Sequence, residues 1–370
     1  MPSPPAILQV LPALESGGVE RGTLEIAEAI RGAGYRAIVA SAGGRLVPEL
    51  EALGARHVTL PLTTKSPIGI WRNASRLAAL AAEEGIGLIH ARSRAPAWSA
   101  LLAARRSGAH FVTTYHGTYG EGWPGKRLYN SVMARGERVI AISRHIADHV
   151  RQTYGDKPMI RVIPRGVDLR RFDPARVDPA RLDALRTAWS LPAGARLVLL
   201  PARMARWKGH EVLIRALTQL PGVIAVLAGD MAGRERYVDE LRVLAREQGV
   251  LDRLRFAGHV SDMPAAMLAA DLVVHASTEA EAFGRTVTEA QALGRPVIAS
   301  DLGGPRETVV DGVTGWLSPP GDAAALVAAI TRVLAMPADR LAAIGEAARR
   351  GVPTLEAMQA ATLAVYRELL

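Results

Sequence analysis

Hydrophobic and polar positions follow two different periods along this chain. Short runs of mostly aliphatic residues, such as 7–10 and 197–200, predict buried strands. Between most of them lie segments with the spacing of amphipathic helices, such as 20–31, 71–83 and 210–220. The other predicted strands are residues 37–40, 57–60, 88–90, 111–114, 139–142, 161–163, 224–227, 254–256, 272–275 and 296–299. Strands that alternate with helices predict parallel sheets with helices on both faces.

The strand–helix pattern runs twice, and residues 168–188 separate the two runs. This segment is rich in Pro, Asp and Arg and lacks a clear period, which is typical of a linker between domains. We therefore predict an α/β fold of two doubly wound, Rossmann-like domains facing a cleft, over residues 1–170 and 171–352. Residues 353–370 read as an Ala- and Leu-rich helix that crosses back to the first domain. Such folds bind ligands at the carboxyl ends of their strands.

The composition indicates a globular protein and shows that its net charge is unevenly distributed along the chain. Hydrophobic residues make up 49% and charged residues 22% of the 370 positions, which excludes a disordered chain. Cys is absent, which excludes disulfides, thiolate metal sites and a Cys nucleophile. The net charge of +9 lies wholly in residues 1–170, which hold 22 basic and 13 acidic side chains, whereas residues 171–370 hold 23 of each. An anionic partner should therefore meet the first half.

Targeting signals are not evident in the sequence. No basic segment precedes the short apolar run 6–14, and no apolar run reaches the roughly 18 residues of a membrane span. We expect a cytoplasmic protein, either soluble or peripheral on the inner face of the plasma membrane.

Two loops carry groups suited to phosphate. Gly17 and Gly18 follow the first strand and precede a helix, where backbone N–H groups favour anions, although a simple tight turn explains the pair equally well. Arg203 and Lys208 share the loop after strand 197–200. Arg can chelate a diphosphate and Lys adds a point charge, although such a loop taken alone is more typical of a solvated surface.

A second group of residues suits a sugar. Glu281 and Glu289 lie eight positions apart, with Phe283 and Gly284 between them. A loop carboxylate, a Gly turn and a helix carboxylate can accept hydrogen bonds from two sets of sugar hydroxyls, although exposed helix carboxylates taken alone are usually just solvated. His116 ends a strand of the first half and would point into the cleft, although a lone His is more often structural.

In this order, the residues resemble the retaining glycosyltransferases of family 4, which have the two-domain glycosyltransferase-B fold. The resemblance covers nearly the whole chain. Its segments are 17–18, 116–117, 139–143, 162–168, 203–209, 228–229, 256–258, 281–289, 296–298 and 311–315. Two positions depart from the family pattern, because Arg165 stands where Asn is common and Ala282 where Gly or Pro is usual. Residues 116–130, which include Trp123, also look like a segment of bacterial lipopolysaccharide-core transferases.

The resemblance implies a role for each of these residues. Arg203 and Lys208 would hold the donor diphosphate and stabilise the leaving group, while Glu281 and His116 would contact the donor sugar. Glu289 would bind the ribose, and the backbones of Gly17, Gly18, Phe283 and Gly284 would add further contacts. The nucleobase pocket would be lined by Gly258, His259 and Val260. Ser143 would be a further pocket residue.

The predicted function is transfer of a hexose, with retention, from UDP-hexose or GDP-mannose to a cell-envelope glycan or glycolipid such as lipopolysaccharide core. Family reasoning favours front-face attack, because no carboxylate stands out as a nucleophile. We expect no cofactor and no metal, because no Asp-x-Asp pair occurs in the chain.

Basic pairs in the first half suggest an anionic acceptor at a membrane, or else a solvated helix surface. They are Arg72 and Arg76, Arg92 and Arg94, Arg105 and Arg106, Lys126 and Arg127, and Arg135 and Arg138. Two other functions stay open: a nucleotide-sugar-binding module without transferase activity, and a cytosolic glycosyltransferase with a small soluble acceptor. A sugar epimerase would need a different carboxylate and His set. Nucleic acid is not expected as a partner, because no recognised binding motif occurs and the second half is neutral.

Overall fold

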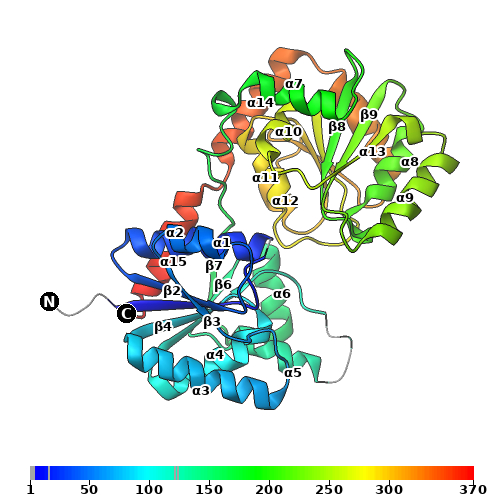
Figure 1. The fold of residues 1–370 in the computed structure, drawn as a ribbon. Coiled ribbons are helices and arrows are strands. Elements are labelled where there is room, and N and C mark those ends of the chain that lie inside the picture. The colour runs from blue at the N-terminus through cyan, green and yellow to red at the C-terminus, as the bar shows by residue number, and fades with distance from the viewer. Residues whose placement is uncertain (1–4, 16, 121, 123–124) are drawn as a thin grey trace. The chain divides into compact units, whose positions relative to one another are not determined.

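The computed structural model describes residues 5–15, 17–120, 122 and 125–370 (Figure 1). Ser16, which precedes the Gly pair, and Trp123 lie outside the described residues. Internal contacts divide the chain into two compact units. Unit 1 comprises Met1–Gly166 and Leu355–Leu370, and unit 2 comprises Val167–Thr354.

Unit 1 is built, in its described residues, on a seven-stranded parallel sheet with the order β3-β2-β1-β4-β5-β6-β7. The strands are β1 (Ala6–Val10), β2 (Arg36–Ser41), β3 (Arg56–Thr59), β4 (Ile86–Ala91), β5 (His110–Tyr115), β6 (Arg138–Ala141) and β7 (Ile160–Val162). The interior strand β1 is buried along its whole length, which explains why four of its five residues are apolar rather than every second one. The fourth residue, Gln9, is buried too, and its side-chain amide donates to the Thr23 carbonyl at 3.0 Å. The strand order reverses between β1 and β4, which makes this the switch point of the sheet.

Helices cover both faces of the unit 1 sheet, and the C-terminal helix joins them (Figure 1). They are α1 (Gly18–Gly32), α2 (Val47–Ala52), α3 (Pro67–Glu84), α4 (Arg94–Ser107), α5 (Lys126–Asn130), α6 (Arg144–Tyr154) and α15 (Leu355–Arg367). Helix α15, red in Figure 1, packs against α1 and buries Met358 and Tyr366 in the unit 1 core. The hydroxyl of Tyr366 lies 2.6 Å from Nδ1 of His90 on β4. The expected return of the C-terminal helix to the first domain is confirmed.

Unit 2 repeats the architecture with a six-stranded parallel sheet, in its described residues, of order β10-β9-β8-β11-β12-β13. Its strands are β8 (Arg196–Pro201), β9 (Val223–Ala228), β10 (Leu254–Gly258), β11 (Leu272–His275), β12 (Val297–Ser300) and β13 (Trp316–Ser318). Its helices are α7 (Pro179–Ala188), α8 (His210–Leu217), α9 (Glu235–Glu247), α10 (Met263–Ala269), α11 (Arg285–Ala292), α12 (Pro305–Thr308), α13 (Ala323–Leu334) and α14 (Ala338–Gly351). Two separate apolar clusters fill this unit, one around Leu213 and Trp316 and the other around Val273 and Val287. The predicted α/β class with two parallel sheets is therefore correct.

The segment interpreted as a linker is folded, so that interpretation is wrong. Residues 168–188 belong to unit 2, where Phe172 is buried and α7 packs against α10. The Asp178-Pro179 pair, which suggested a linker, instead begins α7. Asp178 is the N-cap and accepts from the Ala180 N–H at 2.9 Å, and Pro179 takes the first helical position.

The structure also places a strand that the hydrophobic pattern did not predict. Strand β13 has three residues and pairs with β12 at the edge of the unit 2 sheet. Its two apolar residues, Trp316 and Leu317, stand between Gly315 and Ser318-Pro319, so the sequence shows no apolar run of strand length there. In the part of the chain that is described, no helix is both long and apolar enough to cross a lipid bilayer.

Candidate functional site

The carboxyl edge of the unit 2 sheet carries two loops whose backbones touch. One loop follows β8 and holds Arg203 and Lys208, and the other follows β11 and holds Glu281. Gly209, at the start of α8, has φ 73°, and a Cβ at this position would overlap the carbonyl of Ala276. Glycine therefore serves both the left-handed turn and the close approach of the two loops. This approach brings Lys208 to Glu281.

The Glu281 carboxylate is the centre of a buried polar cluster. Its Oε1 atom forms an ion pair with Nζ of Lys208, accepts from Oγ of Ser277 at 2.6 Å and lies 2.7 Å from Nε2 of His275. The side chains of Lys208 and Glu281 are each 13% exposed. Burial favours the neutral acid, but the hydrogen bond and charge of His275 and the Lys208 ammonium outweigh it and hold the pKa of Glu281 well below its usual range. Glu281 is therefore a fixed, ionised acceptor.

The two cations of the β8 loop have different surroundings. Burial lowers the pKa of Lys208, the Glu281 carboxylate opposes this effect, and the positive charge of Arg203 adds to it. The side chain of Arg203 is exposed. The structure thus gives the loop one anchored, poorly hydrated ammonium and one accessible guanidinium. A guanidinium of this kind offers the planar donor fork that matches phosphate oxygens.

The loop after Glu281 is held by close packing against residues 303–305. Gly304 N–H donates to the Glu281 carbonyl at 2.7 Å, and a Cβ at Gly304 would overlap the backbone of Phe283. Phe283 itself is 4% exposed, so its ring belongs to the core and its backbone alone could meet a ligand. Gly284, with φ 85°, precedes α11 as its N-cap.

Glu289 lies one turn inside α11 and apart from the Glu281 cluster. Its Oε1 is 3.6 Å from Nε of Arg285, and its side chain is 14% exposed. The eight-residue spacing that suggested paired carboxylates therefore places the two on one loop–helix unit, each with its own cationic neighbour. Sequence reasoning proposed roles for both and did not detect either cation pair.

The predicted nucleobase residues lie at the end of β10. Gly258 is the last residue of the strand and has φ 66°, which suits glycine. His259 is exposed, and Val260 packs partly against the apolar cluster around Val273. Of the three, His259 offers an accessible side chain.

In unit 1, the residues named from the sequence lie at the carboxyl ends of β1 and β5. Gly17 is the N-cap of α1 with φ 139°, and Gly18 is the first residue of that helix. His116 follows β5, and its Nε2 has no hydrogen-bond partner within the described residues. Burial, together with the positive charges of Arg92 and Arg165, lowers the pKa of His116 well below its ordinary value. The imidazole is therefore neutral near pH 7.

Ser143 has a structural explanation that the sequence did not reveal. It is 1% exposed and caps α6, because its Oγ accepts from the Ile146 N–H at 3.1 Å. The cap accounts for a serine at this position without a ligand.

We expect Ser143→Ala to lower the free energy of unfolding by about 1 kcal/mol, because the cap is lost, and to leave catalytic turnover unchanged. Urea unfolding and steady-state kinetics measure the two effects. Ser143→Thr, which keeps a hydroxyl, is the matched control and should retain most of the stability. A loss of turnover without a loss of stability would show instead that the hydroxyl meets a ligand.

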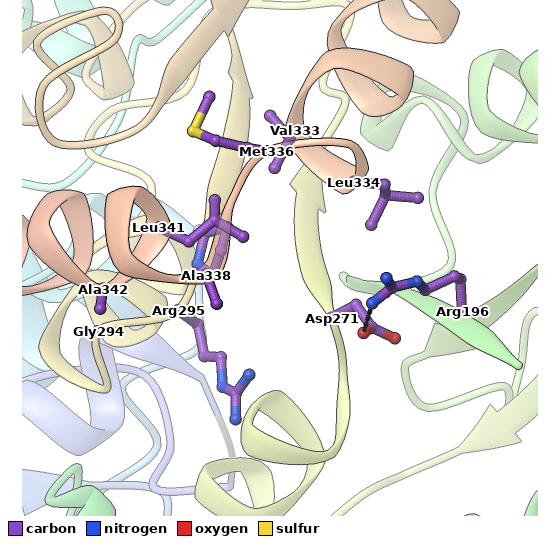
Figure 2. A pocket seen from close by; sticks show the side chains of 11 residues that line it. Arg196, Asp271, Gly294, Arg295, Val333, Leu334, Met336, Ala338, Leu341 and Ala342 are labelled. Carbon is purple, nitrogen blue, oxygen red and sulfur yellow. Dashed lines mark hydrogen bonds and ion pairs between the residues drawn. The ribbon is translucent and has the colours of Figure 1, made fainter. Parts of the chain in front are cut away.

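A pocket of about 440 Å³ opens at the opposite edge of the unit 2 sheet (Figure 2). Its lining includes Arg196, Asp271 and Arg295, which lie at the amino ends of β8, β11 and β12. Arg196 and Asp271 form an ion pair across it at 2.9 Å. The residues proposed from the sequence do not line this pocket, and doubly wound sheets bind their ligands at the carboxyl edge instead.

Comparison with known proteins addresses both halves of the chain. Residues 16–171 match the profile of the family described as Glycosyltransferase Family 4, and residues 183–351 match that of Glycosyl transferases group 1. A GDP-mannose-dependent alpha-(1-6)-phosphatidylinositol monomannoside mannosyltransferase of Mycolicibacterium smegmatis is 31% identical over 291 residues. That alignment covers 75% of this chain and 74% of the relative. The chain belongs to the family 4 glycosyltransferases.

Other relatives match over shorter stretches. A D-inositol 3-phosphate glycosyltransferase of Xylanimonas cellulosilytica is 37% identical over 50% of this chain and 46% of its own length. The lipopolysaccharide core biosynthesis glycosyltransferase LpsE of Rhizobium meliloti is 36% identical over 40% of this chain and 43% of its own length. The chain thus matches less than half the length of either relative.

Solved structures share the fold over nearly the whole chain. A glycosyltransferase from Rickettsia africae has a TM-score of 0.92 and 35% identity, and covers 99% of this chain and 98% of its own. HepE from Anabaena, solved in complex with UDP and glucose, has a TM-score of 0.87 and 27% identity, and covers 98% of this chain and 100% of its own. The two parallel-sheet units are those of the glycosyltransferase-B fold that the sequence predicted.

Proposed function

We propose that the protein is a retaining hexosyltransferase that moves a hexose from a nucleoside-diphosphate sugar to an anionic glycan or glycolipid. The observation that carries this proposal is the polar cluster of unit 2. It holds an ionised Glu281 against Lys208, on a loop that also presents the exposed guanidinium of Arg203. A fixed carboxylate can accept hydrogen bonds from sugar hydroxyls, and the two cations beside it can bind phosphate. Together they fit a sugar joined to a diphosphate.

The donor diphosphate would bind the β8 loop. Arg203 can meet it bidentately, and the Lys208 ammonium gains a second anionic partner there. The nucleoside diphosphate leaves with growing negative charge, so these cations stabilise the leaving group in the transition state. Glu281, already ionised, would accept hydrogen bonds from sugar hydroxyls, and Glu289 would do so from the ribose. UDP-hexose and GDP-mannose both fit, as HepE was solved with UDP and the mannosyltransferase is named for GDP-mannose.

In unit 1, His116 is proposed to orient a sugar hydroxyl. A neutral imidazole has one donor and one acceptor nitrogen, so it can bond a hydroxyl without adding positive charge at the anomeric carbon. Its lowered pKa and its unpartnered Nε2 among the described residues support this role. Gly17 and Gly18 would add backbone N–H groups at the N-terminus of α1.

Transfer is proposed to need no divalent metal, since no Asp-x-Asp pair occurs in the chain. We expect release of UDP or GDP from the donor, followed by a coupled nucleotide assay, to proceed at the same rate with excess EDTA as with added Mg²⁺. The coupling enzymes are added after quenching, so that their own metal requirement does not enter. A rate that falls at least tenfold in EDTA and returns with Mg²⁺ would contradict the metal-free proposal.

An anionic acceptor is supported by the division of charge between the units. Unit 1 holds 22 basic and 14 acidic side chains, an excess of eight, whereas unit 2 holds 23 and 22, an excess of one. The names of two relatives contain phosphate-bearing compounds, inositol 3-phosphate and phosphatidylinositol monomannoside, and the name of a third contains lipopolysaccharide core. A phosphorylated glycolipid such as lipopolysaccharide core accords with both observations.

A membrane that carries such a glycolipid would meet the exposed start of α3. Ile68 is 66% exposed and Trp71 is 58% exposed, and Arg72 and Arg76 beside them are also exposed. The guanidinium of Arg106 on α4 lies 5.5 Å from the Trp71 ring centroid. We call Ile68, Trp71, Arg72, Arg76 and Arg106 the α3–α4 patch. Exposed apolar side chains among arginines suit the interface of an anionic bilayer.

We expect the protein to sediment with vesicles that contain phosphatidylglycerol, but not with vesicles of phosphatidylcholine alone. Each arginine near an anionic surface contributes about 1 kcal/mol, so the double variant Arg72→Gln/Arg76→Gln should bind roughly thirtyfold more weakly. Arg332→Gln, an exposed charge removal in unit 2, is the control and should bind as the wild type does. Equal sedimentation with both kinds of vesicle would remove the membrane from the proposal.

A further inference from the structure

Unit 1 buries a cationic side chain that has an unsatisfied donor. Arg92 directly follows β4 and is 2% exposed, and its Nε has no hydrogen-bond partner in the described part of the chain. Burial lowers the pKa of Arg92, with the nearby Tyr366 and Glu25 acting in the opposite direction. A buried guanidinium is costly unless hydrogen bonds and charge replace its water. The place of Arg92 directly after the predicted strand 88–90 suggests a position facing the cleft, or else on a solvated surface, but the sequence does not predict its burial.

Arg92 lines a small cavity, and a second buried arginine lines it as well. Arg165 is 5% exposed and donates to the Gly18 carbonyl, and its guanidinium fills the space that a side chain at residue 22 would need. Arg92, Arg165 and Thr114 share the cavity with aliphatic side chains. Two cations therefore lie together where the family pattern has an Asn in place of Arg165.

Apart from Glu25 and the second arginine, the titratable groups described around Arg92 are neutral. Burial lowers the pKa values of His90 and His116, and the charge of Arg92 lowers both further, so both rings are neutral. Nε2 of His90 is engaged with Oγ1 of Thr114 at 2.7 Å. Burial raises the pKa of Tyr366, which keeps its hydroxyl neutral too. Glu25 is the carboxylate whose charge bears on Arg92.

The location is that at which this type of sheet binds ligands. Arg92 directly follows β4, and Gly17 and Gly18 begin α1, the helix after β1, so they flank the switch point between β1 and β4. His116, at the end of β5, has a second donor or acceptor atom without a partner among the described residues. Two polar atoms without partners among the described residues, Nε of Arg92 and Nε2 of His116, thus lie after neighbouring strands at the carboxyl edge of unit 1.

We propose that Arg92 and Arg165 form an anion site in unit 1 that binds a phosphate or carboxylate group of the acceptor. The inference rests on the proposed function, since it names what the acceptor must carry. The donor diphosphate is a second source of the same chemistry, but Arg203 and Lys208 in unit 2 already suit it. The cavity has room for about one water molecule, so the anionic group is expected at its opening and not inside it.

Thermal unfolding of the full chain with inorganic phosphate as the probe tests this site. Sodium chloride keeps the ionic strength constant, and UDP or GDP, whichever stabilises the protein, is present at saturation so that the donor site is filled. Phosphate should then still raise the Tm of the wild type, by roughly 2–4 °C at ten times the half-saturating concentration. Without nucleotide, the same titration measures all phosphate sites together.

Three variants show which residues are responsible for the rise in Tm with phosphate. Arg92→Met should abolish the rise in Tm at nucleotide saturation, and its Tm without phosphate should be at least that of the wild type, because a poorly compensated buried charge is gone. Arg92→Lys should keep a smaller rise, since it retains the charge and loses the planar fork. Arg105→Met, an exposed arginine of α4, removes the same charge and should respond to phosphate as the wild type does.

The outcomes separate the site from the proposed function. Two results overturn the acceptor-anion site. One is that phosphate does not raise the Tm of the wild type at nucleotide saturation. The other is that phosphate raises the Tm equally in the wild type, Arg92→Met and Arg92→Lys. The rise in Tm with phosphate can also vanish once nucleotide is bound. If Arg92→Lys then binds nucleotide more weakly as well, the acceptor assignment is overturned and the site belongs to the donor diphosphate. Failure of every nucleotide and nucleotide sugar to raise the Tm of the wild type contradicts the proposed function instead.

Discussion

Glu281→Gln should lower the rate of hexose transfer by about 10²–10³-fold, the range seen when one preorganised polar contact to a transition state is removed. The carboxylate accepts from Ser277 and pairs with Lys208, so its replacement by an amide leaves a buried ammonium without a counter-ion. Losing one partner of a buried ion pair is strongly unfavourable, so we expect Lys208 to shift or to lose its proton. The variant therefore loses a sugar contact and misplaces a diphosphate contact at the same time.

Glu279→Gln is the matched control for this variant. Glu279 lies two residues earlier on the same loop and is exposed, so its amide variant should transfer at nearly the wild-type rate. Steady-state kinetics measure both variants, and their Tm values verify the fold. Because attack is proposed from the front face, intact mass of Glu281→Gln during turnover should show no glycosyl adduct. Undiminished transfer by Glu281→Gln, or an adduct on any carboxylate, would contradict the assigned role.

Arg203→Gln is expected to reduce transfer to a similar degree, about 10²–10³-fold, with most of the effect on kcat. The exposed guanidinium is positioned to meet charge that grows on the leaving diphosphate, so its contribution is larger in the transition state than in the bound donor. Arg203→Lys should recover part of the rate, because it restores the charge without the bidentate geometry.

Arg206 offers the control for charge on this loop. Its guanidinium pairs with Glu240 and Glu211 at an exposed position, where such ion pairs contribute about 0–1 kcal/mol. Arg206→Gln removes the same charge three residues away and should change the rate by less than about twofold. If the two glutamine variants lose activity equally, the effect belongs to the net charge of the loop and not to Arg203.

The fold was largely accessible from the sequence because buried parallel strands leave continuous apolar runs. This signal located β1 and β8 within a residue or two of their observed bounds. It failed for β13, whose two apolar residues stand between Gly315 and Pro319, and for α7, whose Asp-Pro start suggests a linker. Both errors have a local cause, since short segments and helix caps depend on individual contacts and not on periodicity.

The candidate site was accessible to a smaller degree. Charged residues at strand ends drew attention to Arg203, Lys208, Glu281 and Glu289. The ion pair between Lys208 and Glu281 joins positions 73 residues apart, and it depends on the contact of Gly209 with Ala276, which no local pattern encodes. His275 could have been noticed as a polar residue at the end of an apolar strand.

The burial of Arg92 is the clearest case of a property that composition hides. In the sequence it adds one unit to the basic surplus of the first half, like the arginines of the α3–α4 patch. In the structure it is nearly inaccessible and lies beside the equally buried Arg165, whereas Arg72 is exposed. The surplus therefore divides into an internal pair suited to one anionic group and an exposed part suited to a charged surface.

Release of nucleoside diphosphate from a panel of UDP-hexoses and GDP-mannose tests the central claim most directly. The wild type, without acceptor, should hydrolyse at least one of these donors slowly, and Arg203→Gln should lose that activity while Arg206→Gln retains it. This result would establish an active transferase whose donor diphosphate binds the β8 loop. Binding of a donor with no release of nucleotide would show a binding module, and equal release by the wild type and Arg203→Gln would contradict the assigned diphosphate site.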